Sequence, residues 1–424
     1  MSLLTDQLRR GVVSARQLTR TLEISPATLM RWIRAEGGSV VALGRGRATR
    51  YGLRREIEGL EPDLPILRID TSGTPRAVGQ LVALAAEETA WKPGGIVFKG
   101  LPPEIADMQP SGFMGRAFPH QHADLSLPLR IQDWSKDHVL VALARRGDDL
   151  PGNLILGRES IDRWFARRPI PVTRGDYQTL ASAAISGEPP GSSAGGERPK
   201  FGAYVDGHYL LVKFAAGDDP ATRRWKDLLN LEALALETLR KGGVPAVDAT
   251  IFETPTHTFL EVPRFDRVEE RGRRAVMSLA AAYRDASVTW ARAASGLEAQ
   301  GLLSHEDARY LRLYDAFARL IANGERHHDN VCLFPDDEDA VVRARYRLAP
   351  AFDQLPTLYA PASDGSLPER TFVPPTPSAD TWEVWDEAAS LARKYWDEAR
   401  RHDKLSREMK GIARRHLDAQ KGSV

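Results

Sequence analysis

The chain has 424 residues, more than one hydrophobic core usually serves, so we expect two or three domains. Hydrophobic residues make up 42% and charged residues 27% of it, which excludes the intrinsically disordered and fibrous classes. The sequence has no run of the ~18 apolar residues that a membrane span needs, no secretory signal pattern and one cysteine, Cys332. These features predict a cytoplasmic protein without internal disulfides and without a membrane partner.

Residues 1–55 form a basic segment: eleven arginines against three acidic residues give it a charge of +8, whereas the whole chain carries +1. Ser14 and Ser25 are suitable N-caps, and Pro26 stands where a first helical residue needs no partner for its N–H. A two-residue connection between two such helices is typical of a helix-turn-helix. The helical patterns run from Leu3, over 15–22 and over 27–35.

Two strand-like runs follow these helices, at 40–43 and 49–53, around a glycine-rich turn. The whole segment resembles a winged helix, which implies binding to duplex DNA through the major groove and the phosphates. The candidate DNA contacts are Thr28, Arg31 and Arg34 on the last helix and Arg45, Arg47 and Arg50 on the wing. Trp32 fits a core role as well as a contact role, and a basic three-helix cap on another domain is the alternative for the segment.

Residues 56–75 are rich in acidic residues, proline and glycine, and this composition predicts a linker. From Ile96 onward, short strand and helix patterns alternate, and the apolar run 139–143 is interpreted as a buried strand. The mixture predicts an α/β domain after the linker.

Residues 186–200 are rich in Gly, Ser and Pro and show no apolar periodicity, so they must form a loop. Glycine lets backbone N–H groups approach an anion, so the loop is either a linker or a phosphate cradle. The runs 201–205 and 209–214 alternate like two strands of a hairpin, and Lys213 lies at the end of the second. A glycine loop followed by such a hairpin is the arrangement in which protein kinases hold the ATP phosphates with a lysine.

A helix is predicted over 221–241, and one of its carboxylates should pair with Lys213, as in protein kinases. The family resemblance given below implies Glu232 for this role, and a surface role is its alternative. After the next strand come Phe265 and Asp266, for which the family resemblance given below implies packing on an adenine and a contact with a ribose. Ordinary packing at a strand end is the alternative for both residues.

Polar clusters interrupt apolar runs at 323–330 (Asn-Gly-Glu-Arg-His-His-Asp-Asn) and at 350–353 (Pro-Ala-Phe-Asp). Phosphoryl transfer needs a carboxylate near the acceptor hydroxyl, together with an Asn and an Asp that bind a metal ion bridging phosphate oxygens. A zinc site made of His327, His328 and Asp329 is the alternative, but it lacks cysteine partners and an i, i+4 histidine pair.

Together, the glycine loop, Lys213, the Asn230-Leu231-Glu232 segment and the two polar clusters resemble the HipA family of bacterial toxin kinases, in particular its larger members with a DNA-binding domain of their own. The resemblance implies an α+β fold, with a winged helix followed by a two-lobed, protein-kinase-like fold. The lobes would span 76–268, which is α/β, and 269–424, which is helical. ATP and Mg²⁺ are the implied cofactors. The implied partners are a cytoplasmic protein substrate (an aminoacyl-tRNA synthetase is the family precedent), duplex DNA and an antitoxin.

The resemblance also assigns roles to single residues. Lys213, Glu325 and His327 would be catalytic, and Asn330 and Asp353 would bind the metal. The residues matched to nucleotide binding are Ser193, Gly195, Gly196, Lys200, Lys213, Glu232, Phe265, Asp266, His327, Asn330 and Asp353. Ser193 is also the expected autophosphorylation site.

Three features depart from the family pattern. One extra residue, Leu231, separates Asn230 from Glu232. Pro263 replaces a glutamate in the hinge, where adenine recognition uses backbone groups and proline retains its C=O. Glu325 replaces the aspartate that accepts the proton, and the extra methylene displaces the carboxylate by about 1 Å, enough to cost ~10²-fold in rate. The alternative function is therefore a catalytically weakened DNA-binding regulator, or a metal-dependent nuclease that uses the same site.

Overall fold

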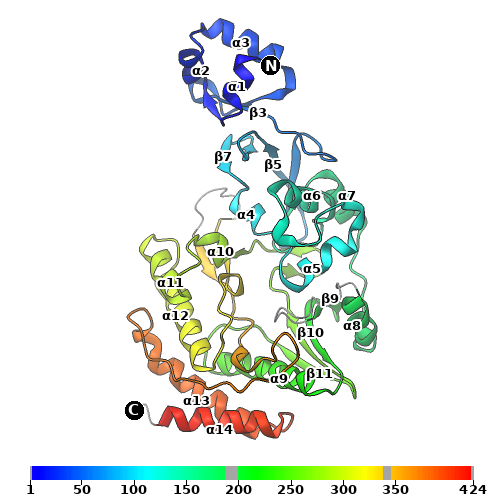
Figure 1. Ribbon diagram of the computed structural model, residues 1–424, viewed down its shortest axis with the longest axis vertical. Coiled ribbons are helices and arrows are strands. Elements are labelled where there is room, and N and C mark those ends of the chain that lie inside the picture. Colours follow the sequence, from blue (N-terminus) through cyan, green and yellow to red (C-terminus); the bar gives the residue numbers. More distant parts are fainter. Residues whose placement is uncertain (1, 187–198, 338–344, 422–424) are drawn as a thin grey trace. The chain divides into compact units, whose positions relative to one another are not determined.

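The computed structural model describes residues 2–186, 199–337 and 345–421, which form two compact units (Figure 1). Unit 1 comprises Met1–Pro110, His122–Arg168 and Arg271–Arg273. Unit 2 comprises Ser111–Gln121, Pro169–Glu270 and Arg274–Val424. Among the described residues, we find no helix with the length and apolar character needed to cross a membrane.

The basic N-terminal segment folds as three helices and a small antiparallel sheet of order β1-β3-β2. Its elements are α1 (Leu3–Leu8), β1 (Val13–Ser14), α2 (Ala15–Thr21), α3 (Pro26–Ala35), β2 (Val40–Leu43) and β3 (Arg50–Leu53). Both predicted N-caps are present, because the Ser14 side chain accepts a hydrogen bond from Gln17 N and that of Ser25 accepts one from Thr28 N. Trp32 packs, partly buried, against the core of this segment and so has a structural role.

A five-stranded antiparallel sheet of order β7-β6-β5-β4-β8 forms the rest of the unit 1 framework. Its strands are β4 (Leu64–Ile69), β5 (Pro75–Ala83), β6 (Glu88–Lys92), β7 (Ile96–Lys99) and β8 (Leu154–Leu156). The prediction of a linker over 56–75 is therefore wrong, since β4 lies inside this sheet. Leu64 and Ile66 alternate along β4 and are 3% and 1% exposed, as expected for a strand. The prolines of the segment favour a loop instead, so the sequence does not predict this strand.

The helices of unit 1 correct a second prediction. Beyond the N-terminal segment, the α-helices of unit 1 are α4 (Pro103–Ala106), α6 (Lys136–Arg146) and α7 (Arg158–Ala166). Residues 139–143 lie within α6 and do not form a strand. A short, continuous apolar run fits a buried helix as well as a buried strand, and here a capping box between Ser135 and His138 begins a helix.

The N-terminal segment and the five-stranded sheet share a hydrophobic cluster. Val41 and Leu43 of β2 pack with Val82, Leu84 and Ala90 from the larger sheet and the turn after β5. Two backbone hydrogen bonds also join the parts, Ala85 N to Leu53 O (2.8 Å) and Arg55 N to Ala83 O (3.0 Å). Removal of residues 1–55 would expose this cluster, so the segment is not separable at residue 55.

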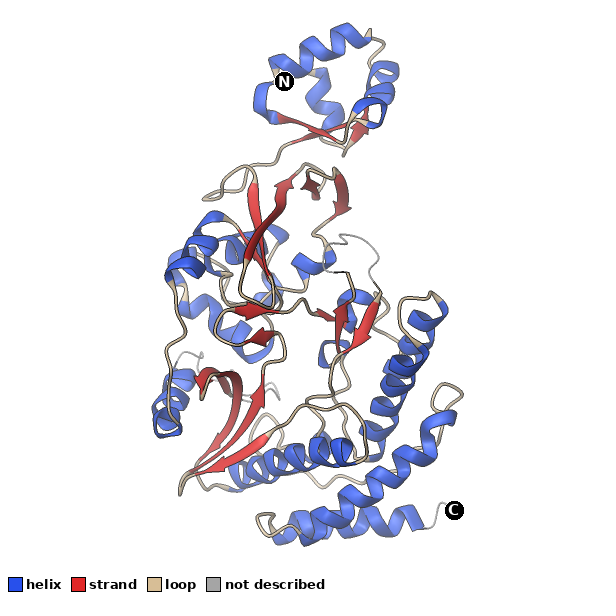
Figure 2. Ribbon diagram, turned by 180° about the vertical axis from the view of Figure 1, so that it is seen from behind, coloured by secondary structure: helices blue, strands red, loops and turns tan. Residues whose placement is uncertain are grey.

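Unit 2 contains a four-stranded antiparallel sheet of order β11-β12-β10-β9. The strands are β9 (Lys200–Val205), β10 (His208–Ala216), β11 (Thr250–Glu253) and β12 (His257–Pro263). The predicted hairpin of β9 and β10 is confirmed, and its turn residues Asp206 and Gly207 both have positive φ (50° and 82°), as a two-residue type I′ turn requires. Helices α8 (Tyr177–Ser186) and α9 (Pro220–Lys241) lie on opposite sides of this sheet (Figure 2). Apolar side chains of α8 pack with the sheet in one hydrophobic cluster, and those of α9 pack with it in another.

Helices dominate the remainder of unit 2, where α9 shares one large core with the helices that follow it. These helices are α10 (Leu279–Ala282), α11 (Trp290–Ala299), α12 (His305–Leu320), α13 (Trp385–Arg401) and α14 (Arg407–Lys421), and α5 (Gly112–Gln121) also belongs to this unit. The short strands of this unit are β13 (Arg267–Val268), β15 (Met277–Ser278), β16 (Cys332–Pro335) and β17 (Tyr346–Leu348), whereas β14 (Gly272–Arg273) belongs to unit 1. The expected lobe 76–268 is thus divided, because most of 76–168 groups with the N-terminal segment in unit 1.

Candidate active site

Lys213 lies between two carboxylates in unit 2. Its Nζ is 2.6 Å from Glu232 Oε1 on α9, and it also contacts Asp353 Oδ1. The Lys213 side chain is 8% exposed and that of Glu232 is 0% exposed. The predicted pairing of Lys213 with Glu232 is therefore present, and Asp353 joins it from a loop that lies 140 positions further along the chain.

The position of Lys213 follows from strand alternation. Val212 and Phe214 pack in the core on the α8 side of the sheet, so Lys213 and Ala215 face α9. Lys200 at the start of β9 pairs directly with Lys213 across the two strands. Directly opposed residues of an antiparallel pair share one face of the sheet, so two of the predicted nucleotide-binding lysines are neighbours.

The loop 323–330 is held by side-chain hydrogen bonds to alternate backbone carbonyls. Arg326 Nη1 donates to Asn323 O, Asn330 Nδ2 donates to Glu325 O (2.9 Å), and Trp290 Nε1 donates to His327 O (3.1 Å). The bond from Asn330 fixes its amide so that the amide oxygen is the atom left for a ligand. His327 itself is exposed, and its backbone, not its ring, makes this anchoring contact.

Further side chains join this loop to the segment that carries Asp353. Asn323 is 1% exposed; its Nδ2 donates to Asp353 O (3.3 Å), and its Oδ1 accepts from Glu325 N (3.0 Å). The Thr357 hydroxyl accepts a hydrogen bond from Gly324 N (2.7 Å) and donates to Asn323 Oδ1 (3.2 Å). The sequence reasoning assigned no role to Asn323 or Thr357, although Asn323 begins the polar cluster.

Asp315 is another residue of this site to which the sequence pattern assigns no role. It lies on α12, is 1% exposed, and its Oδ1 is 3.3 Å from Arg326 Nε, inside the loop 323–330. Burial raises the pKa of Asp315, and the nearby Arg326 opposes that shift. The sequence gives little indication of this ion pair, because it shows only a single Asp on an otherwise apolar helix face.

The hinge residues have other partners than those predicted. The Phe265 ring packs on Phe334 and Phe352, with ring centroids 5.6 and 5.7 Å apart. The Asp266 carboxylate is buried and accepts from Arg264 (3.0 Å) and Arg267 (2.7 Å). Two guanidinium groups thus engage Asp266 in this structure, and its contact with a ribose stays a prediction.

The donor chemistry fits magnesium. Asn330 and Asp353 offer an amide oxygen and a carboxylate, and Mg²⁺ in phosphoryl-transfer sites is usually held by one or two carboxylates together with phosphate oxygens. The zinc alternative is not supported, because His328 is buried with its Nε2 2.9 Å from Val288 O, whereas His327 and Asp329 are exposed. No cluster of three or more His, Cys, Asp or Glu side chains suited to a metal occurs within 2–186, 199–337 and 345–421.

Ser193, Gly195 and Gly196 lie outside the residues that the structure describes. Their predicted roles in nucleotide binding, and that of Ser193 in autophosphorylation, stay predictions.

The candidate DNA contacts are mostly exposed. Arg31 and Arg34 on α3, and Arg45 and Arg47 between β2 and β3, are exposed to solvent. The remaining two have contacts within unit 1: Thr28 Oγ1 accepts from Arg31 (3.2 Å), and Arg50 donates to Gly95 O (2.9 Å).

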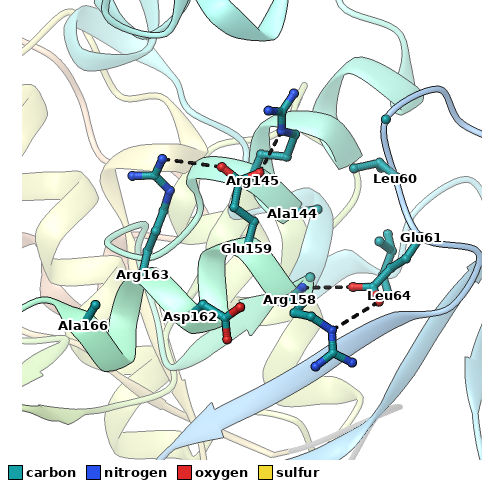
Figure 3. Close-up of a pocket in the computed structure, with 12 residues that line it drawn as sticks. Leu60, Glu61, Leu64, Ala144, Arg145, Arg158, Glu159, Asp162, Arg163 and Ala166 are labelled. Carbon is teal, nitrogen blue, oxygen red and sulfur yellow. Dashed lines mark hydrogen bonds and ion pairs between the residues drawn. The ribbon is translucent and has the colours of Figure 1, made fainter.

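A pocket of about 610 Å³ lies in unit 1, whereas the Lys213 cluster belongs to unit 2 (Figure 3). Glu159 pairs there with Arg145 (2.9 Å) and Arg163 (3.4 Å), and Glu61 accepts from Arg158 N (3.0 Å). Its lining carries three acidic and three basic side chains, so it offers a ligand no net charge. The pocket therefore offers no net positive charge to attract a polyphosphate.

Comparisons with known proteins cover nearly the whole chain. A family model described as "YjjJ-like toxin, middle domain" matches residues 60–165, and one described as "HipA-like C-terminal domain" matches residues 192–419. The curated protein "Toxin YjjJ" of Escherichia coli (strain K12) is 33% identical over 97% of this chain and 96% of its own length.

One solved structure is similar in fold, and a second matches more weakly. A chain of the "Shewanella oneidensis MR-1 Toxin Antitoxin System HipA, HipB and its operator DNA complex" matches with a TM-score of 0.52 and 13% identity, over 84% of this chain and 96% of that chain. The Helicobacter pylori proinflammatory kinase CtkA matches with a TM-score of 0.36 and 12% identity, over 53% of this chain and 88% of that chain. Since the C-terminal family model alone spans more than half of the sequence and the curated relative aligns almost from end to end, the chain belongs to the YjjJ-like toxins of the HipA-like family.

Proposed function

We propose that this protein is a toxin kinase that transfers the γ-phosphate of ATP to a serine or threonine of another protein. The observation that carries the proposal is Lys213, buried between Glu232 and Asp353. A lysine paired with a helix glutamate and adjacent to a metal-binding aspartate is the arrangement that holds ATP phosphates in kinases. A buried ammonium group with two carboxylates is otherwise costly to keep in a protein interior.

Each residue of the site has a distinct role in this proposal. When bound, ATP would supply the phosphoryl group, and Mg²⁺ would neutralise the negative charge of the ATP phosphates. Lys213 binds phosphate oxygens, and Glu232 fixes the direction of its side chain. Asn330 and Asp353 offer oxygen ligands to the metal, and Glu325 accepts the proton of the substrate hydroxyl.

The partners are proposed from the relatives. The curated relative is named a toxin, and the similar HipA structure is that of a toxin-antitoxin system in complex with its operator DNA. These relatives support an antitoxin and duplex DNA as partners of this chain. For the substrate we propose a cytoplasmic protein, with aminoacyl-tRNA synthetases as the first group to test.

The test is transfer of labelled γ-phosphate to proteins of a cell lysate and to purified aminoacyl-tRNA synthetases. Asp353→Asn, which removes the charge at nearly unchanged size, is the control. Label that appears with the natural protein and not with Asp353→Asn supports the kinase. Cleavage of DNA by the natural protein, with no transfer of label, would favour the nuclease alternative instead.

We also propose that residues 1–55 form a winged helix that binds duplex DNA. The specific support is the pair α2 and α3, each begun by a serine cap, with exposed Arg31 and Arg34 on α3. Arg45 and Arg47 lie exposed between two paired strands, the place of a wing. Arginine side chains in these positions suit phosphate contacts, which fix the protein on the duplex.

Replacement of Arg45 and Arg47 by alanine should weaken DNA binding mainly at low salt. Each arginine that contacts a phosphate displaces condensed counterions and contributes about −0.9 to the slope of log K against log [salt]. The slope of the double variant should therefore be shallower by up to about 2. Fluorescence anisotropy of a labelled duplex at several salt concentrations measures it.

The control is Arg130→Ala, which removes an exposed charge outside residues 1–55. Point variants are preferable to deletion of residues 1–55, because deletion exposes the cluster around Val82 and Leu84. Equal slopes for the double variant and the control would contradict the wing contacts, and absence of binding even at low salt would contradict the DNA-binding function.

A further inference from the structure

Two loops of unit 2 meet at the Thr357 hydroxyl. One loop carries Glu325, and Gly324 directly before it donates its N–H to Thr357 Oγ1 (2.7 Å). The other carries Asp353, four residues before Thr357. The same hydroxyl donates to Asn323 Oδ1 (3.2 Å), the atom that also accepts from Glu325 N (3.0 Å). One hydroxyl thus contacts the two residues that precede the proposed proton acceptor.

Two further hydrogen bonds, one between backbone groups and one from a side chain, reinforce the junction. Leu358 N donates to Ala322 O (3.1 Å), and Asn323 Nδ2 donates to Asp353 O (3.3 Å). We call the contacts among Asn323, Gly324, Asp353 and Thr357 the loop clasp.

The clasp holds backbone that is unfavourable on its own. Ala322 and Asp353 both adopt left-handed φ angles, 65° and 55°, without being glycine. Such residues persist only where their surroundings determine them, and they cluster at functional sites. A loop with this conformation needs fixed contacts, and the Thr357 hydroxyl provides two of them.

We propose that Thr357 is a positioning residue that sets the distance between Glu325 and the metal ligand Asp353. This role rests on the proposed kinase function, because it matters only if Glu325 and Asp353 act on one phosphoryl transfer. Thr357 touches neither nucleotide nor metal in this proposal. It acts through Gly324 and Asn323.

Thr357→Val tests the hydroxyl, since valine has nearly the same shape as threonine but cannot bond to Gly324 N or Asn323 Oδ1. The catalytic constant kcat should fall by ~10-fold, because a misplacement of 1 Å can cost up to ~10²-fold. The loss should stay below that limit, because the hydrogen bonds from Leu358 N to Ala322 O and from Asn323 Nδ2 to Asp353 O remain. The KM for ATP and the stabilisation of the protein by ATP with Mg²⁺ should stay unchanged, because Lys213 and Asn330 are not altered.

Two matched variants accompany it. Thr357→Ser retains the hydroxyl and should restore most of kcat. Thr238→Val removes a buried hydroxyl on α9 that bonds only within its helix, to Leu234 O (2.7 Å), and should leave kcat unchanged. If Thr357→Val does not fold, Thr357→Ala removes the same hydroxyl. Its kcat is then compared with those of Thr357→Ser and Thr238→Val.

Amide hydrogen exchange gives a second readout that needs no activity. The N–H groups of Gly324 and Glu325 should exchange faster in Thr357→Val than in the natural protein and Thr357→Ser. If the natural protein transfers phosphate and Thr357→Val has the kcat of Thr357→Ser, the positioning role is overturned and the kinase function stands. If the natural protein transfers no phosphate to any substrate, the kinase function falls and the positioning role with it, even where exchange at Gly324 changes.

Discussion

Lys213→Met is expected to lower the rate of phosphate transfer by ~10²–10³-fold, the loss typical when one donor to a developing charge is removed. The variant should also lose its stabilisation by ATP with Mg²⁺, because a ligand raises the melting temperature only when it binds the native state. The physical reason is that Lys213 Nζ is the cation of this cluster, between Glu232 and Asp353. The measurements are the initial rate with labelled ATP and the melting temperature with and without ATP and Mg²⁺.

Stability must be separated from function in this test. Glu232 is 0% exposed, and removal of one partner from a buried ion pair can destabilise a protein by about 3–5 kcal/mol. The double variant Lys213→Met/Glu232→Gln removes the uncompensated charge and should recover stability without recovering activity. Lys241→Met, at the exposed end of α9, makes the same chemical change outside the cluster and should retain both properties.

Asp353→Asn extends the test to the metal side of the site. It should abolish the Mg²⁺-dependent part of the stabilisation, because an amide is a weaker ligand than a carboxylate for a hard cation. An unchanged shift of the melting temperature with ATP in both Lys213→Met and Asp353→Asn would show that ATP binds elsewhere or not at all.

The local parts of this site could be predicted from the sequence because each leaves a short pattern. The turn Asp206-Gly207 between two alternating runs specifies the β9–β10 hairpin. The apolar periodicity of 221–241 predicts α9, and Glu232 on it does pair with Lys213. Both elements are short-range features, in which neighbouring residues determine the conformation.

The remaining contacts could not be predicted because they join distant segments. Asp315 and Thr357 become relevant only through Arg326, Gly324 and Asn323, and no spacing rule connects them. The same limit explains residues 139–143, where a five-residue apolar run does not distinguish a buried strand from α6.

The second large effect is expected at Glu325, where aspartate should raise the rate of phosphate transfer by up to ~10²-fold. Two accounts of this glutamate are possible. In the first, the loop backbone has shifted to place the longer side chain correctly, so Glu325→Asp would lower activity. In the second, the extra methylene is uncompensated, and Glu325→Asp restores the family geometry.

The contacts of the loop favour the second account. Glu325 N donates to Asn323 Oδ1 (3.0 Å), and Glu325 O accepts from Asn330 Nδ2 (2.9 Å). Hydrogen bonds on both sides of the residue leave its backbone little freedom to move by the ~1 Å that the longer side chain requires. Asn330 is itself a proposed metal ligand, so a shift at Glu325 would also disturb the metal site.

Initial rates of phosphate transfer at saturating ATP, for the natural protein, Glu325→Asp and Glu325→Gln, decide between the accounts. Glu325→Gln cannot accept a proton and should be the slowest. Glu306→Asp, an exposed position in the first turn of α12, is the matched control and should not alter the rate. ATP binding should be similar in all four proteins, because Lys213 and Asp353 are unchanged. A lower rate for Glu325→Asp than for the natural protein would support the first account, in which the loop has adapted. Equal rates for the natural protein, Glu325→Asp and Glu325→Gln would mean that this carboxylate is not the base.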